Sequence, residues 1–222
     1  MSTAANSTSI VAPPGMPPVA FSAAIRPLSR LAGMRHRRFS VSEYERLVAA
    51  GELTENDRCE LIRGVITDKM GIGDLHAACV NRLNWLFNRA AGEQFLVSIQ
   101  NPIRLSDSVP EPDCVLAAFR ADYYGQAKPV PAEVLLLIEV ADSSLDSDRQ
   151  IKLPLYAENH IREYWIVNLI DECLEVYRQP QGSAYGQRVE LRRGQTVSPL
   201  ALPALSITVE SILGTPTAAP AE

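Results

Sequence analysis

The apolar stretch Val134–Ala141, with the sequence VLLLIEVA, decides the fold. It follows Pro129 and Pro131 and precedes the polar turn Asp142–Ser144. A short, nearly continuous apolar run with such borders is typical of a central strand that is buried on both faces. We therefore predict a strand at this position, in the middle of a sheet.

One carboxylate, Glu139, interrupts this apolar run. Burying an unpaired charge is costly, so the group must be neutralised, paired or bound to a metal ion. Glu139 either lies at the strand end, where an arginine or water satisfies it, or belongs to a functional site. The neighbouring segments favour the functional site.

The composition is typical of a globular protein with one domain and a tail. The 222 residues are 46% hydrophobic and 21% charged. No apolar stretch approaches the length of a membrane span and no leader precedes a cleavage site, so we expect a cytoplasmic protein with no membrane contact. The net charge of −5 argues against a protein that coats nucleic acid with a broad basic face, but it is compatible with a nuclease.

The cysteines and histidines narrow the choice of metal. The four cysteines are scattered singly and the three histidines are isolated: Cys59, Cys79, Cys114, Cys173, His36, His76 and His160. This pattern argues against a disulfide scaffold, a thiolate zinc site or a histidine-rich site. Any metal would be held by oxygen ligands, which favours Mg²⁺ or Mn²⁺ over Zn²⁺.

Composition also suggests three parts of the chain. Residues 1–37 are rich in Ala, Ser and Pro and are predicted to form a disordered arm, whose basic end we interpret as solvated rather than phosphate-bound. Residues 38–213 are the predicted folded domain. Residues 214–222 are predicted to fray.

Local patterns predict the elements of the domain. Ser40 and Glu43 form a capping box for a helix that ends at Ala50. A further helix, capped by Asp74, is expected to reach about residue 90, with Leu75, Cys79, Leu86, Phe87 and Ala90 as its apolar stripe. Another is expected from a cap at Ser144 or Ser147 to about Asn159, disturbed by Pro154. Strands are expected at 59–66, 95–99, 102–105, 114–117, 134–141, 163–168, 174–177, 187–191 and 207–209. Gly64 marks a bulge or a tight turn in the first of them, and 163–168 and 174–177 are predicted to form a hairpin.

Three charged residues lie where a site would form. Asp113 precedes one strand, Glu139 lies in the next, and Lys152 is on the following helix, on one face with Asp148 and Tyr156. Because consecutive strands are usually neighbours, we expect the two carboxylates to converge. A divalent cation between them would relieve their repulsion and activate water, and a lysine would orient that water or offset developing charge.

One further residue belongs with this group of charged residues, and one of its members has an alternative explanation. Glu60, in the first predicted strand, is a candidate fourth member. The alternative for Lys152 is a helical ion pair with Asp148, worth only ~0.3–0.5 kcal/mol.

A series of motifs resembles the Uma-type (Uma-two) family, mostly bacterial proteins assigned to the restriction-endonuclease-like fold with a PD-(D/E)XK site. The resemblance covers roughly residues 38–180. It is carried by five segments in order: Cys59–Gly64, Pro110–Asp113, Ile138–Ser144, Lys152–Ala157 and Glu163–Val167.

The resemblance implies an α/β (α+β) fold, with a mixed central sheet flanked by helices. It also implies Mg²⁺ or Mn²⁺ held by Asp113, Glu139 and the backbone carbonyl of Val140, with Glu60 as the upstream acid. The chain departs from the superfamily pattern at Ala141, where the basic residue normally stands. Its counterpart here would be Lys152, displaced onto the following helix.

The leading hypothesis is a metal-dependent endonuclease in which Asp113, Glu139, Lys152 and Glu60 are catalytic. Its partner would be nucleic acid, with DNA favoured, and a homodimer is compatible with cutting both strands. Four arginines are candidates for holding phosphates: Arg63, Arg104, Arg149 and Arg162. Two alternatives remain, a non-catalytic binding or interaction module on the same fold and a metal-dependent hydrolase of a small phosphorylated molecule.

Overall fold

The computed structural model describes residues 37–215. Nearly all of the predicted disordered arm and of the predicted frayed tail lies outside this range. Within it, no helix combines the length and the apolar character that a membrane crossing requires.

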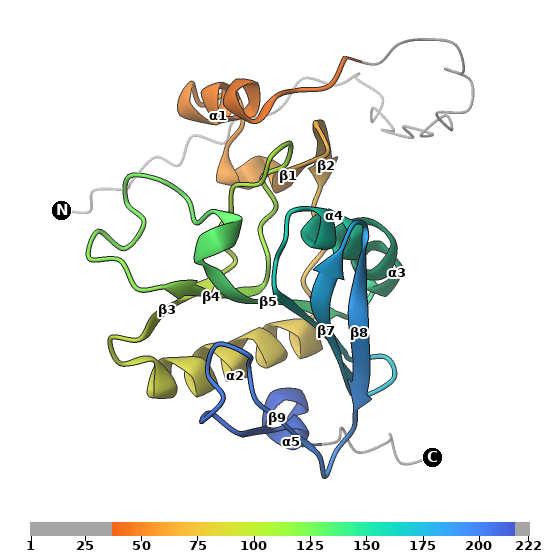
Figure 1. Cartoon of the computed structure of the whole chain (residues 1–222). Helices are drawn as coiled ribbons and strands as arrows, with labels where there is room; N and C mark the ends of the chain where they lie inside the picture. Colours follow the sequence, from red (N-terminus) through yellow and green to blue (C-terminus); the bar gives the residue numbers. More distant parts are fainter. Residues whose placement is uncertain (1–36, 216–222) are drawn as a thin grey trace, which may run out of the picture. The chain divides into compact units, whose positions relative to one another are not determined.

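A six-stranded mixed sheet forms the centre of the domain (Figure 1). The strands follow the chain in order: β3 (Phe95–Ile99), β4 (Cys114–Ala118), β5 (Val134–Ala141), β6 (Glu163–Asn168), β7 (Cys173–Gln181) and β8 (Ala184–Leu191). β5 and β6 are parallel and all other neighbours are antiparallel. The predicted mixed sheet and the predicted β6–β7 hairpin are thus confirmed.

β5 has apolar neighbours on both faces, which explains its continuous apolar sequence. Leu136, Ile138 and Val140 belong to one core cluster, whereas Leu137 and Ala141 belong to a second. Because successive side chains of a strand point to opposite faces, a strand buried on both sides cannot show polar alternation.

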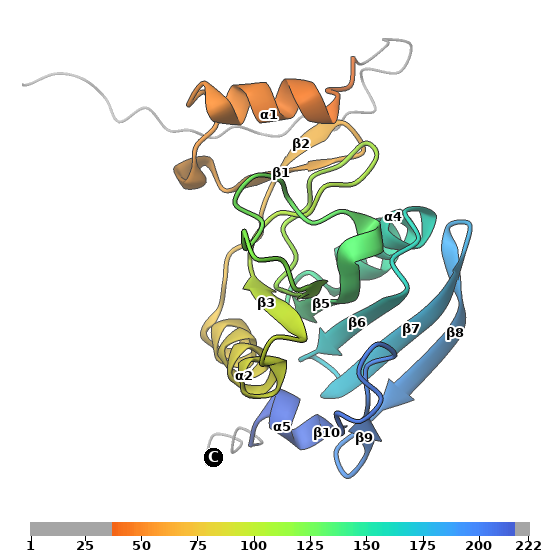
Figure 2. The same ribbon diagram turned by 60° about the vertical axis from the view of Figure 1, so that its left-hand side comes forward.

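Helices cover both faces of the sheet (Figure 2). The first face carries α2 (Asp74–Ala91) and α5 (Val209–Leu213). The second carries α3 (Leu145–Ser147), the π-helical segment η4 (Asp148–Lys152) and α4 (Leu153–Glu158). The predicted disturbance near Pro154 takes the form of η4, since a wider turn just before proline accommodates the missing N–H and the bulky ring.

The predicted stripe of α2 is partly wrong. Leu75 is 57% exposed, and Leu86 and Ala90 are only half-buried. The buried residues are Cys79, Val80, Leu83, Phe87 and Ala91, which follow one another at intervals of one, three and four positions. The helix begins at Asp74 and its N-cap is Gly73, so Asp74 is the first helical residue rather than the cap.

A small N-terminal layer consists of α1 (Val41–Ala49), the 3₁₀ turn η2 (Glu55–Asp57), β1 (Cys59–Ile62) and β2 (Val65–Asp68). The predicted capping box of Ser40 and Glu43 is present. One continuous strand at 59–66 is wrong, because β1 and β2 form an antiparallel hairpin, but the tight turn that was one of the two alternatives at Gly64 is confirmed. Arg63 and Gly64 make its turn, both with positive φ.

Two further strand predictions need correction. Residues 102–105 form a loop, in which Ile103 and Leu105 donate backbone hydrogen bonds to Pro110 and Ser108. The strand predicted at 207–209 is β10 (Ile207–Thr208), which pairs with β9 (Thr196–Val197) outside the main sheet. The 3₁₀ turn η3 (Pro131–Glu133) leads into β5.

The turn between β1 and β2 generates the first prediction. Gly64 has φ +75°, and a Cβ there would lie 2.9 Å from the carbonyl oxygen of Phe39. Gly51 has φ +74° but nothing within 4 Å, so it is a matched control for backbone strain alone. We expect Gly51→Ala to lower the free energy of unfolding by ~1–2 kcal/mol and Gly64→Ala by at least ~1 kcal/mol more, measured by urea unfolding. Equal losses would contradict the steric argument.

Candidate active site

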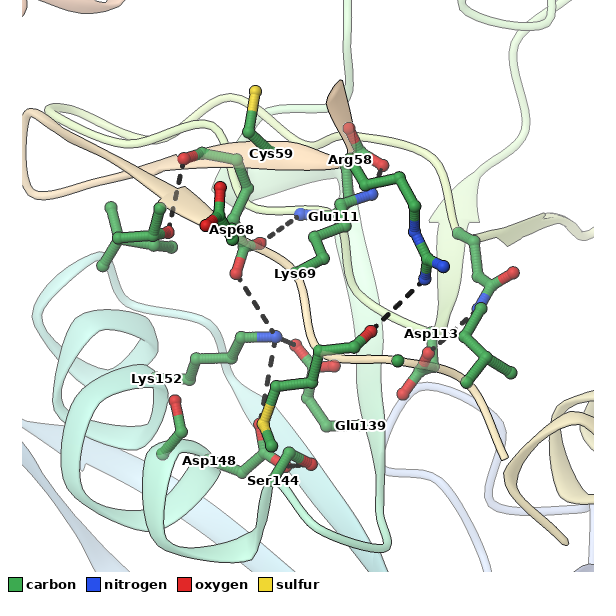
Figure 3. Close-up of a pocket in the computed structure, with 18 of the residues that line it drawn as sticks. Arg58, Cys59, Asp68, Lys69, Glu111, Asp113, Glu139, Ser144, Asp148 and Lys152 are labelled. Atoms are coloured by element: carbon green, nitrogen blue, oxygen red, sulfur yellow. Dashed lines mark hydrogen bonds and ion pairs between the residues drawn. The ribbon is translucent and has the colours of Figure 1, made fainter. Parts of the chain in front are cut away.

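The register of β4 and β5 brings two carboxylates together. Cys114 pairs with Ile138, so one step further along the antiparallel register places Asp113 opposite Glu139. The backbone N–H of Val140 donates to Asp113 Oδ2 at 2.8 Å. Both carboxylates line one pocket of about 880 Å³, together with Glu60 and Lys152 (Figure 3). The predicted convergence of these residues therefore occurs.

Lys152 reaches the acids from the helical side of the pocket. Its Nζ lies 2.9 Å from Glu139 Oε1 and 3.9 Å from Glu60 Oε1. The helical pair with Asp148 also exists, at 3.9 Å. The contact with Glu139 is the shortest of the three, so the ion pair along the helix does not by itself explain the position of Lys152. Figure 3 shows its side chain extending from the helix toward Glu139.

Glu139 is held through one of its two oxygens. Lys152 Nζ donates to Oε1 at 2.9 Å and the Tyr156 hydroxyl donates to the same oxygen at 2.7 Å. Among the residues that the structure describes, no hydrogen bond engages Oε2 of Glu139. The carboxylate is thus fixed in direction while one oxygen remains available.

Asp113 is held in the same manner. Its Oδ2 accepts from Val140 N and contacts His76 Nε2 at 3.1 Å. Its Oδ1 has a single, longer contact of 3.3 Å, from the side-chain amide of Gln100. In each carboxylate, contacts with two groups fix the position of one oxygen. The other oxygen is available to bind a ligand.

His76 and Tyr156 were not recognised from the sequence as site residues. The position of His76 in the first turn of the predicted helix was compatible with a site, but it favoured a solvent-facing or hydrogen-bonded histidine. Its Nδ1 is buried and has no hydrogen-bond partner among the described residues. The i+4 spacing of Lys152 and Tyr156 was a usable signal, because it placed the tyrosine hydroxyl on the face that carries the lysine.

Glu60 joins the N-terminal layer to the site. Its Oε2 accepts the backbone N–H of Glu111 at 3.0 Å, and its Oε1 faces Lys152. The hairpin that carries Glu60 is thereby fixed to the segment that leads into β4. Glu60 thus contacts the lysine, and no hydrogen bond links its carboxylate to Asp113 or Glu139 in the described part of the chain.

The pocket concentrates negative charge. Burial, opposed by Lys152 and reinforced by Asp148 and Asp113, raises the pKa of Glu139 to about 8. Burial likewise raises the pKa of Glu60 and of Asp148, again against the effect of Lys152. The neighbouring acids Asp113 and Asp148 add to this effect of burial on Glu139, and Asp113 and Glu60 add to it on Asp148.

The acids of the pocket also raise the pKa of the basic groups beside them. Burial alone would lower the pKa of Lys152, but Glu139, Glu60 and Asp148 raise it well above its ordinary value. The hydrogen bond to Asp113 raises the pKa of His76. Burial would raise the pKa of Asp113, but the hydrogen bond and charge of His76 and the Val140 N–H lower it below its usual value.

The donor set suits a magnesium-type ion that keeps part of its water. No three His, Cys, Asp or Glu side chains within residues 37–215 are grouped so that they alone could hold a metal. Mg²⁺, however, is commonly bound by one or two carboxylates, with water and substrate phosphate completing its shell. The available oxygens of Asp113 and Glu139 fit that requirement.

The candidate phosphate-binding arginines are mostly engaged elsewhere. Arg63 pairs with Glu158 at 2.7 Å and Arg104 with Glu45 at 2.5 Å. Arg149 pairs with the buried Glu175. None of these three arginines, nor Arg162, lines the pocket.

The basic residues on the hairpin side of the pocket are instead Arg58 and Lys69. Lys69 pairs with Glu111, and the Arg58 guanidinium donates to the carbonyl of Met70. Figure 3 shows both side chains on the wall opposite Lys152. A substrate at this wall would therefore contact Arg58, just before β1, and Lys69, just after β2.

Comparison with known proteins gives a family and a fold. A family model described as "Uma2: Putative restriction endonuclease" matches residues 41–210. A crystal structure of a putative nuclease belonging to DUF820 from Anabaena variabilis superposes with a TM-score of 0.64 at 15% identity, covering 79% of this chain and 97% of that chain. No curated protein matches the sequence.

The charge imbalance generates the second prediction. Lys152 lowers the pKa of Glu139, Glu60 and Asp148, so Lys152→Met raises all three in the folded state. The carboxylates of the folded variant then hold more protons than those of the folded wild type, whereas the proton of Lys152 is bound in both states of the wild type and cancels. The stability of the variant relative to the wild type therefore falls as pH rises. We expect a deficit that grows to ~3–5 kcal/mol by about pH 9, measured by urea unfolding with chelator present.

The control is Lys128→Met, which removes a half-exposed lysine 3.3 Å from Glu45. It should cost less than ~1 kcal/mol at every pH. A Lys152→Met deficit that does not change between pH 5 and 9 would contradict the proposed electrostatic coupling.

Proposed function

Because the chain belongs to the Uma2 family, described as putative restriction endonucleases, we propose that it hydrolyses phosphodiester bonds of nucleic acid at the pocket around Glu139. The match confirms the family resemblance of the sequence motifs. One observation carries the proposal. Asp113 and Glu139 meet on adjacent strands, each with one oxygen locked and one available, and Lys152 lies 2.9 Å from Glu139.

The proposal includes a divalent cation. The available oxygens of Asp113 and Glu139, with the backbone carbonyl of Val140, would hold Mg²⁺ or Mn²⁺. When bound, such an ion lowers the pKa of a water ligand and offsets charge on the phosphoryl oxygens. The neighbouring acids support this: Asp148 and Asp113 add to the effect of burial in raising the pKa of Glu139, and a cation would offset their contribution.

The protein's own groups would then orient the reactants. Lys152 stays protonated because three carboxylates surround it, so its role is to donate hydrogen bonds to the attacking water and to offset charge on the phosphoryl group. Tyr156 and His76 fix the two carboxylates. Glu60 adds a longer ion pair to the same amine, 3.9 Å away. Water adds to phosphorus and one P–O ester bond breaks, leaving a phosphate monoester and a hydroxyl.

A second function is favoured by the size of the pocket. Its volume of about 880 Å³ lies within the range of small-molecule sites. A hydrolase of a small phosphorylated molecule would use the same carboxylates. The non-catalytic alternative is disfavoured, because Lys152 points toward the carboxylates rather than away from them.

The third prediction tests the activity. Purified protein should cleave labelled oligonucleotides with Mg²⁺ or Mn²⁺ and not with chelator. Asp113→Asn, Glu139→Gln and Lys152→Met should each reduce the rate at least ~100-fold, because each removes a group that acts on the reacting phosphate or its ion.

Glu45→Gln is the matched control, since this acid lies outside the pocket and pairs with Arg104 and Lys128. It should retain the wild-type rate. Parallel assays with bis(p-nitrophenyl) phosphate and p-nitrophenyl phosphate separate diester from monoester chemistry. Hydrolysis of the monoester alone would establish the second function in place of the first.

The fourth prediction concerns Tyr156 as a positioning residue. Tyr156→Phe leaves the ring and removes the 2.7 Å hydrogen bond to Glu139, so Glu139 loses one of its two constraints. We expect a loss of ~10-fold in cleavage and a higher Mg²⁺ concentration for half-maximal rate.

Tyr185→Phe is the control, because this tyrosine belongs to the same aromatic cluster and donates to the carbonyl of Ile161, away from the site. It should leave the Mg²⁺ dependence unchanged. Equal effects of the two substitutions would indicate that packing, and not the orientation of Glu139, determines the rate.

A further inference from the structure

The pocket has an apolar rim around its acidic centre. Val48, Met70, Ile72 and Ile151 are each between 47% and 50% exposed, and all four line the pocket. Val48 comes from α1, Met70 and Ile72 from the segment after β2, and Ile151 from η4. The rim, as we name these four residues, therefore includes both the N-terminal layer and the helix that carries Lys152.

Isolated exposed apolar side chains are common on protein surfaces, but several of them around one pocket are unusual. Thirteen large apolar side chains are exposed in the described part of the chain, and four of them lie on this one pocket. They line the same pocket as the two carboxylates proposed to hold the cation. A ligand in the pocket would thus meet apolar surface and reactive groups together.

The charged residues of the lining are predominantly acidic. Only Arg58, Lys69 and Lys152 carry a permanent positive charge, against eight acids: Glu55, Glu60, Asp68, Glu111, Asp113, Glu139, Asp142 and Asp148. Lys69 and Lys152 are already paired with acids. Double-stranded DNA carries one negative charge per ~1.7 Å and is normally held by many basic contacts. This lining offers few of them.

We propose that the pocket accepts an unpaired nucleotide, from a single strand or from a bulge in a duplex, with its base against the rim and its phosphate at the carboxylates. The inference rests on the proposed function and defines its substrate class. In a duplex the faces of the bases are stacked and cannot contact an apolar surface, whereas an unpaired base exposes them. A single nucleotide also brings few phosphates into an acidic pocket.

The test is oligonucleotide binding to the full-length protein, separate from cleavage. Fluorescence anisotropy is measured with Ca²⁺ in place of Mg²⁺, for single-stranded DNA, RNA of the same sequence, perfect duplex DNA, and the same duplex with one bulged nucleotide. We expect the single strands and the bulged duplex to bind at least ~10-fold more tightly than the perfect duplex. The ratio of the DNA and RNA affinities identifies the preferred sugar.

Substitutions in the rim test whether the base binds there. Met70→Ser combined with Ile72→Ser should weaken single-strand binding by ~10-fold and leave duplex binding unchanged. Ile170→Ser is the control, because Ile170 is 59% exposed and does not line the pocket. All these side chains are exposed, so urea unfolding should show no change in stability that could explain the loss.

The outcomes separate this inference from the proposed function. Duplex binding as tight as single-strand binding, no oligonucleotide binding, or rim variants that bind like the wild type would each overturn the inference. Cleavage of perfect duplex DNA would do so while leaving the endonuclease proposal intact. Preferential binding of unpaired strands without metal-dependent cleavage would support the inference and reject the endonuclease.

Discussion

A carboxylate inside a doubly covered strand is the constraint on which the rest of the structure depends. Glu139 is 3% exposed and lies in the centre of a sheet, where an unsatisfied charge would be prohibitive. Lys152 and Tyr156 satisfy one of its oxygens. Both come from the helical segment that follows β5, so the geometry of that segment is tied to a single acid.

The same requirement explains the interrupted helix. Asp148, Lys152 and Tyr156 must all face the strand, although Pro154 lies between the last two. The π-helical turn at η4 widens the backbone just before the proline and lets the three side chains share a face. π-Helical turns frequently occur at functional sites, and here the local irregularity places the lysine beside the acid.

The sequence was sufficient for the central strands and for the convergence of Asp113 and Glu139, because these follow from apolar periodicity and from the adjacency of consecutive strands. Glu60 and Lys152 were named as candidates, but their place beside Glu139 depends on how a separate hairpin and a helix pack against the sheet. It was insufficient where tertiary contacts decide. The loop at 102–105 has strand-like composition, but its N–H groups donate to the carbonyls of Pro110, Pro129 and Ser108, which lie outside the strands, rather than to a neighbouring strand. The role of His76 required knowing that the start of α2 lies beside Asp113, which no local pattern contains.

Ala141 explains why a lysine approaches Glu139 from the helix rather than from the strand. Ala141 is fully buried and lies, like Glu139, an even number of residues from Leu137, so the three side chains share the face that α4 covers. A lysine at position 141 would have to fit its long side chain into that packed core. A lysine on η4 approaches Glu139 from the same side of the sheet while its stem remains at the pocket wall. The amine therefore reaches the carboxylate from the helix rather than from the strand, and the small residue at 141 lets the helix pack against this face.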